Sequence, residues 1–185
     1  MKNLFLVLVA SFFTMSMFAQ GTMEKTVMVG GAAMYPSKNI IENAVNSKDH
    51  TTLVAAVKAA DLVATLSSAG PFTVFAPTNA AFDKLPAGTV ETLVKPENKA
   101  LLTTILTYHV VSGKFSSRDL TKLIKDGNGS AMLKTVQGGM LKATFHGKRG
   151  IMLTDAKGGT SMITIKNVNQ SNGVIHVIDT VLMPQ

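Results

Sequence analysis

Cysteine and tryptophan are both absent from this chain of 185 residues. Without cysteine there is no thiolate nucleophile, no cysteine-ligated zinc site and no cysteine to carry a lipid anchor. Without tryptophan, and with no arginine-rich run among interleaved aromatic residues, the chain lacks the usual stacking platform for nucleic acid. We therefore expect no nucleic-acid partner.

Charged residues are also scarce, at 16% of the chain against about 25% in an average globular domain. Apolar residues make up 46%, enough for a core that needs no disulfides. The length fits one domain plus a removable leader. The formal net charge is +7 at pH 7, and the densest basic group is Lys142, Lys148 and Arg149. This excess favours adhesion to anionic surfaces, or it is a solvated basic surface.

The first 19 residues have the three parts of a secretory signal peptide. Lys2 supplies the positive charge, residues 4–18 are almost wholly apolar, and Ala19 offers a small residue before cleavage at Gln20. The apolar stretch is shorter than the ~20 residues that a spanning helix needs, although an uncleaved anchor is the alternative. We predict a secreted, extracellular or periplasmic protein that could associate with the cell surface, with no integral membrane span after cleavage.

Residues 20–37 form a lead segment that we expect to be partly extended, and residues 38–185 form the domain. Helix signals dominate the first half of the domain, with helical spacing of apolar residues over 53–60. Two capping-box patterns predict helix starts, Asn39 with Glu42 and Ser116 with Asp119.

The second half of the domain reads as short strands separated by turns that contain glycine. A strand is also expected at 72–76 and another at 108–111. The last run, 174–182, has apolar side chains on both of its alternating faces, so we expect a central strand buried on two sides. Helices first and an antiparallel sheet second predict an α+β architecture. The later strands are expected at 132–136, 140–145, 151–154, 160–166 and 174–182.

Three segments carry a family resemblance. They are residues 70–82 (GPFTVFAPTNAAF), residues 106–111 (LTYHVV) and residues 172–184 (NGVIHVIDTVLMP). In order and spacing they resemble the first signature box, the tyrosine-histidine motif and the second signature box of the fasciclin (FAS1) domain family. The resemblance implies a fasciclin-like fold, an antiparallel β-wedge or sandwich packed with several short helices. It also implies an extracellular module used in adhesion, matrix or surface interactions.

The three boxes supply the candidate interaction residues, which are Tyr108, His109, Thr78, Asn79, His176 and Asp179. Eukaryotic members use the tyrosine-histidine segment for integrin contact, so the resemblance offers a partner surface at Tyr108 and His109 as the alternative. Core packing is the preferred interpretation of both residues. Thr78 or Asn79 is expected to cap a short helix. His109 and His176 are expected to tie neighbouring strands through hydrogen bonds, because a buried polar ring must find partners.

No catalytic signature appears in the sequence. It contains no Gly-x-Ser-x-Gly elbow and no phosphate-binding loop. The other two histidines are His50, in an expected loop, and His146, at an expected strand end, and they lack metal-ligand spacing. We expect no enzyme activity, no cofactor and no metal; a hydrolase that uses His109 or His176 is the least favoured alternative.

The predicted function is a secreted or cell-surface fasciclin-type binding module that mediates adhesion to an extracellular protein or polysaccharide surface. The alternative is a soluble extracellular carrier of a small apolar ligand. Its motivation is a set of methionines on the expected sheet, since methionine forms adaptable binding surfaces as well as filling cores. Core filling is the preferred interpretation of these methionines, and the sequence predicts no oligomeric state.

Overall fold

A computed structural model describes residues 24–147 and 150–185. The predicted signal peptide lies outside the described residues, as do Lys148 and Arg149. The helices are α1 (Ile40–Ala44), η1 (Lys48–His50), α2 (Thr51–Ala59), α3 (Val63–Ser67), α4 (Asn79–Phe82), α5 (Thr89–Leu93), η2 (Pro96–Asn98), α6 (Lys99–Tyr108) and α7 (Ser117–Asp126). The strands are β1 (Val27–Val29), β2 (Ala32–Met34), β3 (Phe72–Pro77), β4 (Val110–Ser112), β5 (Ser130–Lys134), β6 (Met140–His146), β7 (Gly150–Thr154), β8 (Thr160–Gln170) and β9 (Gly173–Ile178).

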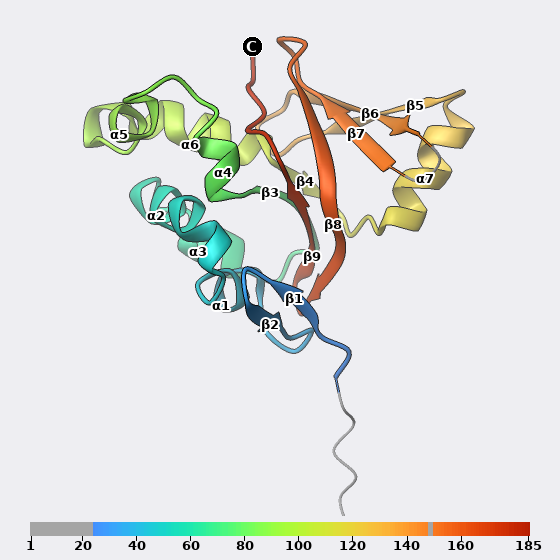
Figure 1. Cartoon of the computed structure of the whole chain (residues 1–185), viewed down its shortest axis with the longest axis horizontal. Helices are drawn as coiled ribbons and strands as arrows, with labels where there is room; N and C mark the ends of the chain where they lie inside the picture. The colour runs from blue at the N-terminus through green and yellow to red at the C-terminus, as the bar shows by residue number, and fades with distance from the viewer. Residues whose placement is uncertain (1–23, 148–149) are drawn as a thin grey trace, which may run out of the picture.

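Seven strands form one sheet in the order β4-β3-β9-β8-β7-β6-β5 (Figure 1). Every neighbouring pair is antiparallel except β3 and β9, which run parallel with Phe72 opposite Gly173. The sheet is therefore mixed, which corrects the expected purely antiparallel pairing at this one pair. Most of the domain separates these two strands in sequence, so no hairpin turn dictates their direction. A bridge between Val111 and Thr135 brings the two ends of the sheet together toward a near-barrel.

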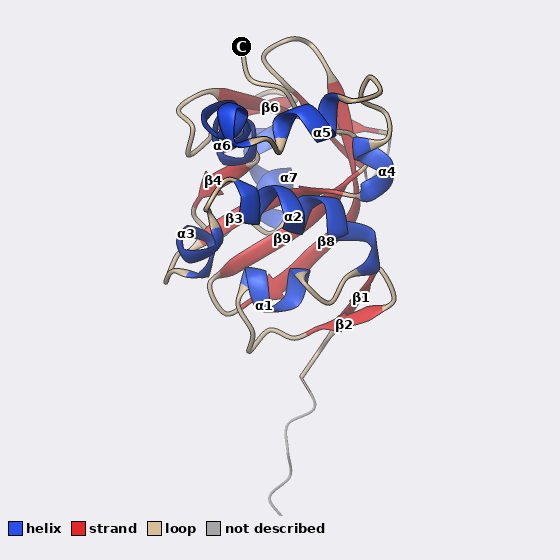
Figure 2. Ribbon diagram, turned by 90° about the vertical axis from the view of Figure 1, so that its left-hand side faces the viewer, coloured by secondary structure: helices blue, strands red, loops and turns tan. Residues whose placement is uncertain are grey.

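Strands β3 and β9 are buried on both faces, as predicted for the last strand. On one face Val74 and Val177 belong to a core that includes residues of α1, α2 and α6. On the other face Phe75 and Ile178 belong to a second core, which includes Leu120 of α7 and the inward side chains of β5 to β8. Helix α7 accordingly lies on the β5–β7 side of the molecule, away from the remaining helices (Figure 1). In the view of Figure 2, which faces those other helices, α7 lies behind them.

Both predicted capping boxes are present, at the starts of α1 and α7. The expected strand over 108–111 is wrong in its first half. Helix α6 continues through Tyr108, His109 forms its C-cap, and β4 begins at Val110. The apolar stripe of α6, with Leu102 and Leu106 buried, extends the helix until the Tyr108 ring reaches the second core. Packing therefore overrides the local β preference of tyrosine and valine.

Ser171 and Asn172 form the turn between β8 and β9, and Gly173 is the first residue of β9. The buried Asn172 side chain accepts a hydrogen bond from the Ile40 amide (3.0 Å) and donates to two carbonyls at the end of α3 (both 2.8 Å). Gly173 lies so close to β3 that an added Cβ would stand 2.2 Å from the Phe72 carbonyl oxygen. This turn therefore holds α1, α3 and β3 together, which positions the helices over the sheet.

Candidate functional site

Tyr108 lies at the end of α6 with its side chain wholly buried. Its hydroxyl donates to the Met140 carbonyl (2.8 Å) and accepts from the Ala156 amide (3.0 Å). Burial raises the pKa of the phenol above its ordinary value, and the Ala156 amide partly offsets this rise. The hydroxyl thus ties α6 to β6 and to the turn after β7.

His109 lies between α6 and the C-terminal segment that follows β9. The Leu182 amide donates to Nε2 at 3.0 Å, so Nε2 carries no proton. The other nitrogen, Nδ1, therefore carries the proton and donates to the Ile105 carbonyl at 2.8 Å. Burial lowers the pKa of the ring to about 4, although the Ile105 carbonyl and Asp155 act in the opposite direction. His109 is therefore neutral at pH 7.

His176 projects from β9 into the second core. Its Nε2 donates to the Phe115 carbonyl (2.9 Å), and its Nδ1 accepts a long bond from the Asn167 amide (3.4 Å). The ring stacks on Phe75, with the centroids 5.9 Å apart. Burial lowers the pKa of His176 as well. These bonds join β9 to its neighbour β8 and to the loop before α7. His109, which was also expected to tie neighbouring strands, instead joins helix α6 to the C-terminal segment.

Thr78, Asn79 and Asp179 also make their bonds within the molecule. Thr78 caps α4 as predicted. Asn79 accepts from the Thr52 amide (3.0 Å) and so joins α4 to the start of α2. Asp179 accepts from the Met162 amide (2.8 Å) at the end of β9. Burial on its own raises the pKa of Asp179, but this bond, two hydroxyl donors and a nearby lysine lower it overall.

The six candidate residues are therefore dispersed over several junctions of the fold. Within the described ranges, neither His109 nor His176 makes a hydrogen bond to a carboxylate. Tyr108, His109 and His176 are buried, as the core-packing interpretation expected. A role for these residues in contact with a partner stays a prediction.

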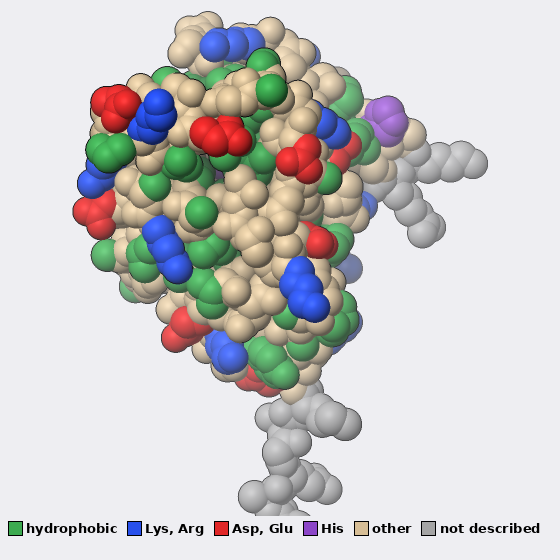
Figure 3. All heavy atoms as spheres, turned by 60° about the vertical axis from the view of Figure 1, so that its left-hand side comes forward, with side chains coloured by type: hydrophobic (Ala, Val, Ile, Leu, Met, Phe, Trp, Pro, Cys, Tyr) green, Lys and Arg blue, Asp and Glu red, His purple; other side chains and the backbone are tan. Residues whose placement is uncertain are grey.

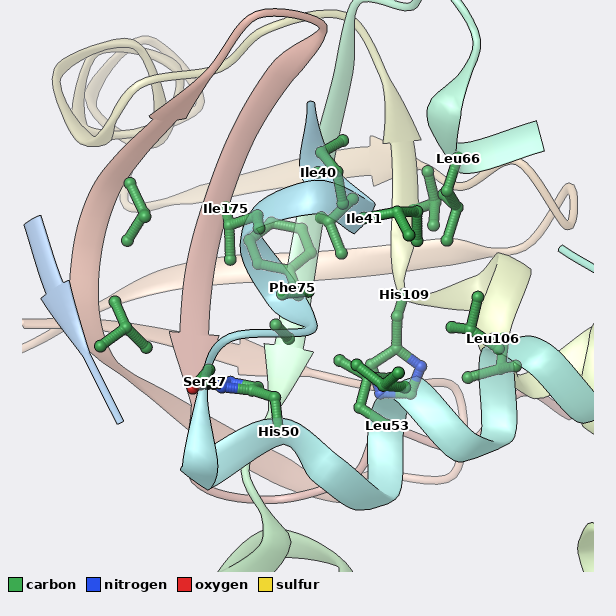
Figure 4. A pocket seen from close by; sticks show the side chains of 18 of the residues that line it. Ile40, Ile41, Ser47, His50, Leu53, Leu66, Phe75, Leu106, His109 and Ile175 are labelled. Atoms are coloured by element: carbon green, nitrogen blue, oxygen red, sulfur yellow. Dashed lines mark hydrogen bonds between the residues drawn. The ribbon is translucent and has the colours of Figure 1, made fainter. Parts of the chain in front are cut away.

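The molecule contains a second feature that the sequence did not indicate, an apolar cavity of about 50 Å³ between the helices and the sheet. Its walls come from the β1–β2 hairpin, α1, α2, α3, α6 and the central strands. Leu53 and Leu106 approach it from the helices, and Phe75 and Ile175 from the sheet (Figure 4). The wall is almost entirely hydrocarbon, and its polar members are Ser47, His50, Lys58 and His109.

His50 is the residue that sequence reasoning placed wrongly. The expected loop position is in fact the end of η1, where only 4% of the residue is exposed. Its Nδ1 shares a hydrogen bond with the Ser47 hydroxyl (2.8 Å; Figure 4). Its Nε2 is buried, and no described atom meets the geometry of a hydrogen bond to it. Burial lowers the pKa of His50, against smaller raising effects of the Ala76 carbonyl and Asp49.

The methionines of the sheet do not fill the core. Met132 and Met140 are 56% and 42% exposed, and Met152 and Met162 are partly exposed. The core-filling interpretation is therefore wrong for these residues, and the cavity is lined by a single methionine, Met34. Core filling was expected for these methionines because apolar residues occur on both faces of the predicted strands, so the sequence does not show which face is buried.

Comparison with known proteins identifies the class. The fasciclin domain family matches residues 48–184, so the chain belongs to this family. "Protein sll1483" of Synechocystis sp. is 46% identical over 171 residues, covering 92% of this chain and 87% of that protein. "Cell surface glycolipoprotein MPB83" of Mycobacterium bovis is 43% identical over 124 residues, or 67% of this chain and 48% of that protein.

A solved structure supports the fold. A FAS1 domain pair from the insect cell adhesion molecule Fasciclin I matches with a TM-score of 0.71 at 18% identity, over 80% of this chain and 52% of that one. The predicted α+β fasciclin-like fold is confirmed. Throughout residues 24–147 and 150–185, no helix has the length and hydrophobicity to cross a membrane. The same residues hold no cluster of three or more histidine and acidic side chains that could bind a metal.

Proposed function

We propose that this protein is a non-enzymatic extracellular binding module that adheres to an anionic polysaccharide at the cell envelope or matrix. Membership of the fasciclin family supports an adhesion-type, surface-associated module in general terms. The mycobacterial relative is a cell surface glycolipoprotein, which supports an exported location for this protein.

The observation that carries the proposal is an exposed face on β5 and β6 where methionine and lysine alternate. Met132 pairs with Lys142 across the two strands, and Lys134 pairs with Met140. All four side chains are exposed. Neither lysine lies within 4.0 Å of a described carboxylate. We call these four residues the Met–Lys face.

The charge of this face suits a polyanion. Two lysines without described acidic partners attract an anionic chain, and flexible thioether side chains adapt to its apolar surfaces. By contrast, on the helix-covered side of the molecule seen in Figure 3, basic and acidic side chains are interspersed and neither sign forms a continuous patch. The proposal therefore places adhesion on the sheet side, at β5, which lies at the end of the strand order.

Retention of the purified mature chain on alginate and heparin beads tests the proposal. We expect binding at low salt that falls steeply as salt rises, because exposed charges are screened. The double variant Lys134→Gln/Lys142→Gln should lose retention. The charge-matched control Lys95→Gln/Lys114→Gln, which changes two exposed lysines elsewhere, should keep it. Equal retention of both double variants would reject the Met–Lys face, and binding to envelope proteins alone would reject the polysaccharide.

The chain organisation behind this function is also a proposal. Residues 1–19 would direct export, residues 20–37 would form the lead segment and residues 38–185 the domain. The lead segment contains the β1–β2 hairpin, and Asn43 of α1 bonds to it through the Tyr35 amide (3.0 Å) and carbonyl (2.8 Å). Fractionation of cells, followed by N-terminal sequencing of the exported protein, tests this division; a mature chain that still begins at Met1 would contradict it.

A further inference from the structure

The cavity behind α1 and α2 opens toward one side of the molecule. Most of its lining residues are buried, and those with solvent exposure all come from α1, α2 and α3. Lys58 is exposed, and Ile41, Ala44, Val54 and Val63 are partly exposed. The rim between these three short helices is therefore the route by which a molecule from solvent would reach the cavity.

His50 places one unsatisfied polar atom in this hydrocarbon wall. Leaving a buried ring nitrogen without a full hydrogen bond destabilises the fold, so the arrangement is unfavourable unless something completes it. The other buried histidines differ in this respect. His109 and His176 both have partners for each of their ring nitrogens, whereas the Nε2 atom of His50 has none among the described residues.

Water is a poor candidate for the missing partner. A buried water typically makes about three hydrogen bonds. Here the Ser47 hydroxyl already bonds to His50, and both nitrogens of His109 already have partners. A molecule with one polar group and an aliphatic body fits this wall better, because its body replaces lost van der Waals contacts while its polar group completes His50.

We propose that this cavity binds a small uncharged aliphatic molecule with a single oxygen, such as a short-chain alcohol or ketone. Its oxygen would hydrogen-bond to His50 Nε2, and its alkyl part would lie against Leu53, Val57 and Ile175. A charged headgroup does not suit the buried part of the wall, because the charged residue in the described lining, Lys58, lies at the exposed rim. At about 50 Å³ the cavity admits about four non-hydrogen atoms. This site is independent of the Met–Lys face and of the proposed adhesion.

A pair of probes with equal size separates the polar and apolar parts of this proposal. 1-Propanol and n-butane have the same number of non-hydrogen atoms, and only the alcohol can bond to His50. In an NMR titration of the mature chain with 1-propanol, we expect saturable shifts of the methyl groups of Leu53, Val57 and Leu106. We also expect a shift of the His50 Nε2 resonance, since a new hydrogen bond changes its electronic environment.

The variant His50→Leu removes the polar anchor and keeps an apolar side chain. We expect it to bind 1-propanol about three- to tenfold more weakly, the worth of one hydrogen bond, without weakening n-butane. His146→Leu, at an exposed histidine, should match the wild type. Shifts that never saturate, an equal loss for both probes, or a water at Nε2 that propanol fails to displace would overturn the proposal. If His50→Leu does not fold, the His50 resonance of the wild type decides the matter.

Discussion

Acid should weaken this fold through His109, because its ring is buried and both of its nitrogens already have partners. The neutral ring accepts from the Leu182 amide and donates to the Ile105 carbonyl. A second proton would have to go onto Nε2, where it would face the Leu182 N–H at 3.0 Å. Protonation therefore breaks the link between α6 and the C-terminal segment and leaves a charge in the core.

The pKa of His109 fixes the pH range of this effect. Burial lowers it from 6.5 to about 4 in the folded protein. Because the folded state disfavours the second proton on His109, the unfolded state binds more protons below pH 6.5. The free energy of unfolding therefore decreases as the pH is lowered. This stabilisation is complete above the unfolded pKa and is lost between pH 6.5 and pH 4. From pH 7 to pH 5 the loss from His109 alone is about 2 kcal/mol.

Urea denaturation of the mature chain at intervals from pH 7 to pH 5 measures this loss. The variant His109→Gln cannot take up the proton, so its free energy of unfolding should fall by about 2 kcal/mol less than that of the wild type over this range. His146→Gln, which changes an exposed histidine, should follow the wild-type curve. His50 and His176 contribute to the pH dependence of all three proteins, so only the difference between the curves is diagnostic. Parallel curves for His109→Gln and the wild type would refute the assignment of a neutral, buried His109.

Three further substitutions should lower the free energy of unfolding at pH 7, as measured by urea denaturation. Asn172→Ala removes the buried bonds to α1 and α3 and should cost about 2–4 kcal/mol, whereas a change below 0.5 kcal/mol would show that the turn does not hold these helices. Gly173→Ala sets a methyl 2.2 Å from the Phe72 carbonyl oxygen and should cost about 1–3 kcal/mol; a neutral result would mean that β3 and β9 can separate freely. Tyr108→Phe leaves the Met140 carbonyl and the Ala156 amide without their partner and should cost about 1–3 kcal/mol, and unchanged stability would argue against this tie.

Local signals in the sequence predicted the local structure well. The capping boxes at Asn39 and Ser116 formed because side-chain oxygens and amides three residues apart satisfy each other without help from the rest of the chain. The two-sided burial of β9 followed from its uninterrupted apolar pattern. These features depend on residues that are neighbours in the sequence, so the sequence alone is sufficient to predict them.

Features set by distant segments were beyond such reasoning. The parallel pairing of β3 with β9 joins strands from opposite halves of the domain, and neither strand encodes its partner's direction. The prediction of a strand at Tyr108 was wrong because its ring packs in the second core, which is assembled from β5 to β9 and α7, while its backbone ends helix α6. The outward direction of Met132 and Met140 likewise depends on which face of the sheet meets α7.

The same distinction bears on how the buried histidines are interpreted. Nothing in the sequence around His50, His109 or His176 tells which ring completes its hydrogen bonds, because the partners lie on other elements. Two of the rings join strands, helices and loops with both of their nitrogens, which is sufficient reason for a polar residue to be buried there. His50 bonds to Ser47 through one nitrogen, whereas its Nε2 has no bond of full geometry, although the Ala76 carbonyl lies near enough to act on the ring. A leucine at this position would avoid the cost of that nitrogen, so the imidazole is better explained by a ligand that completes it than by the stability of the fold.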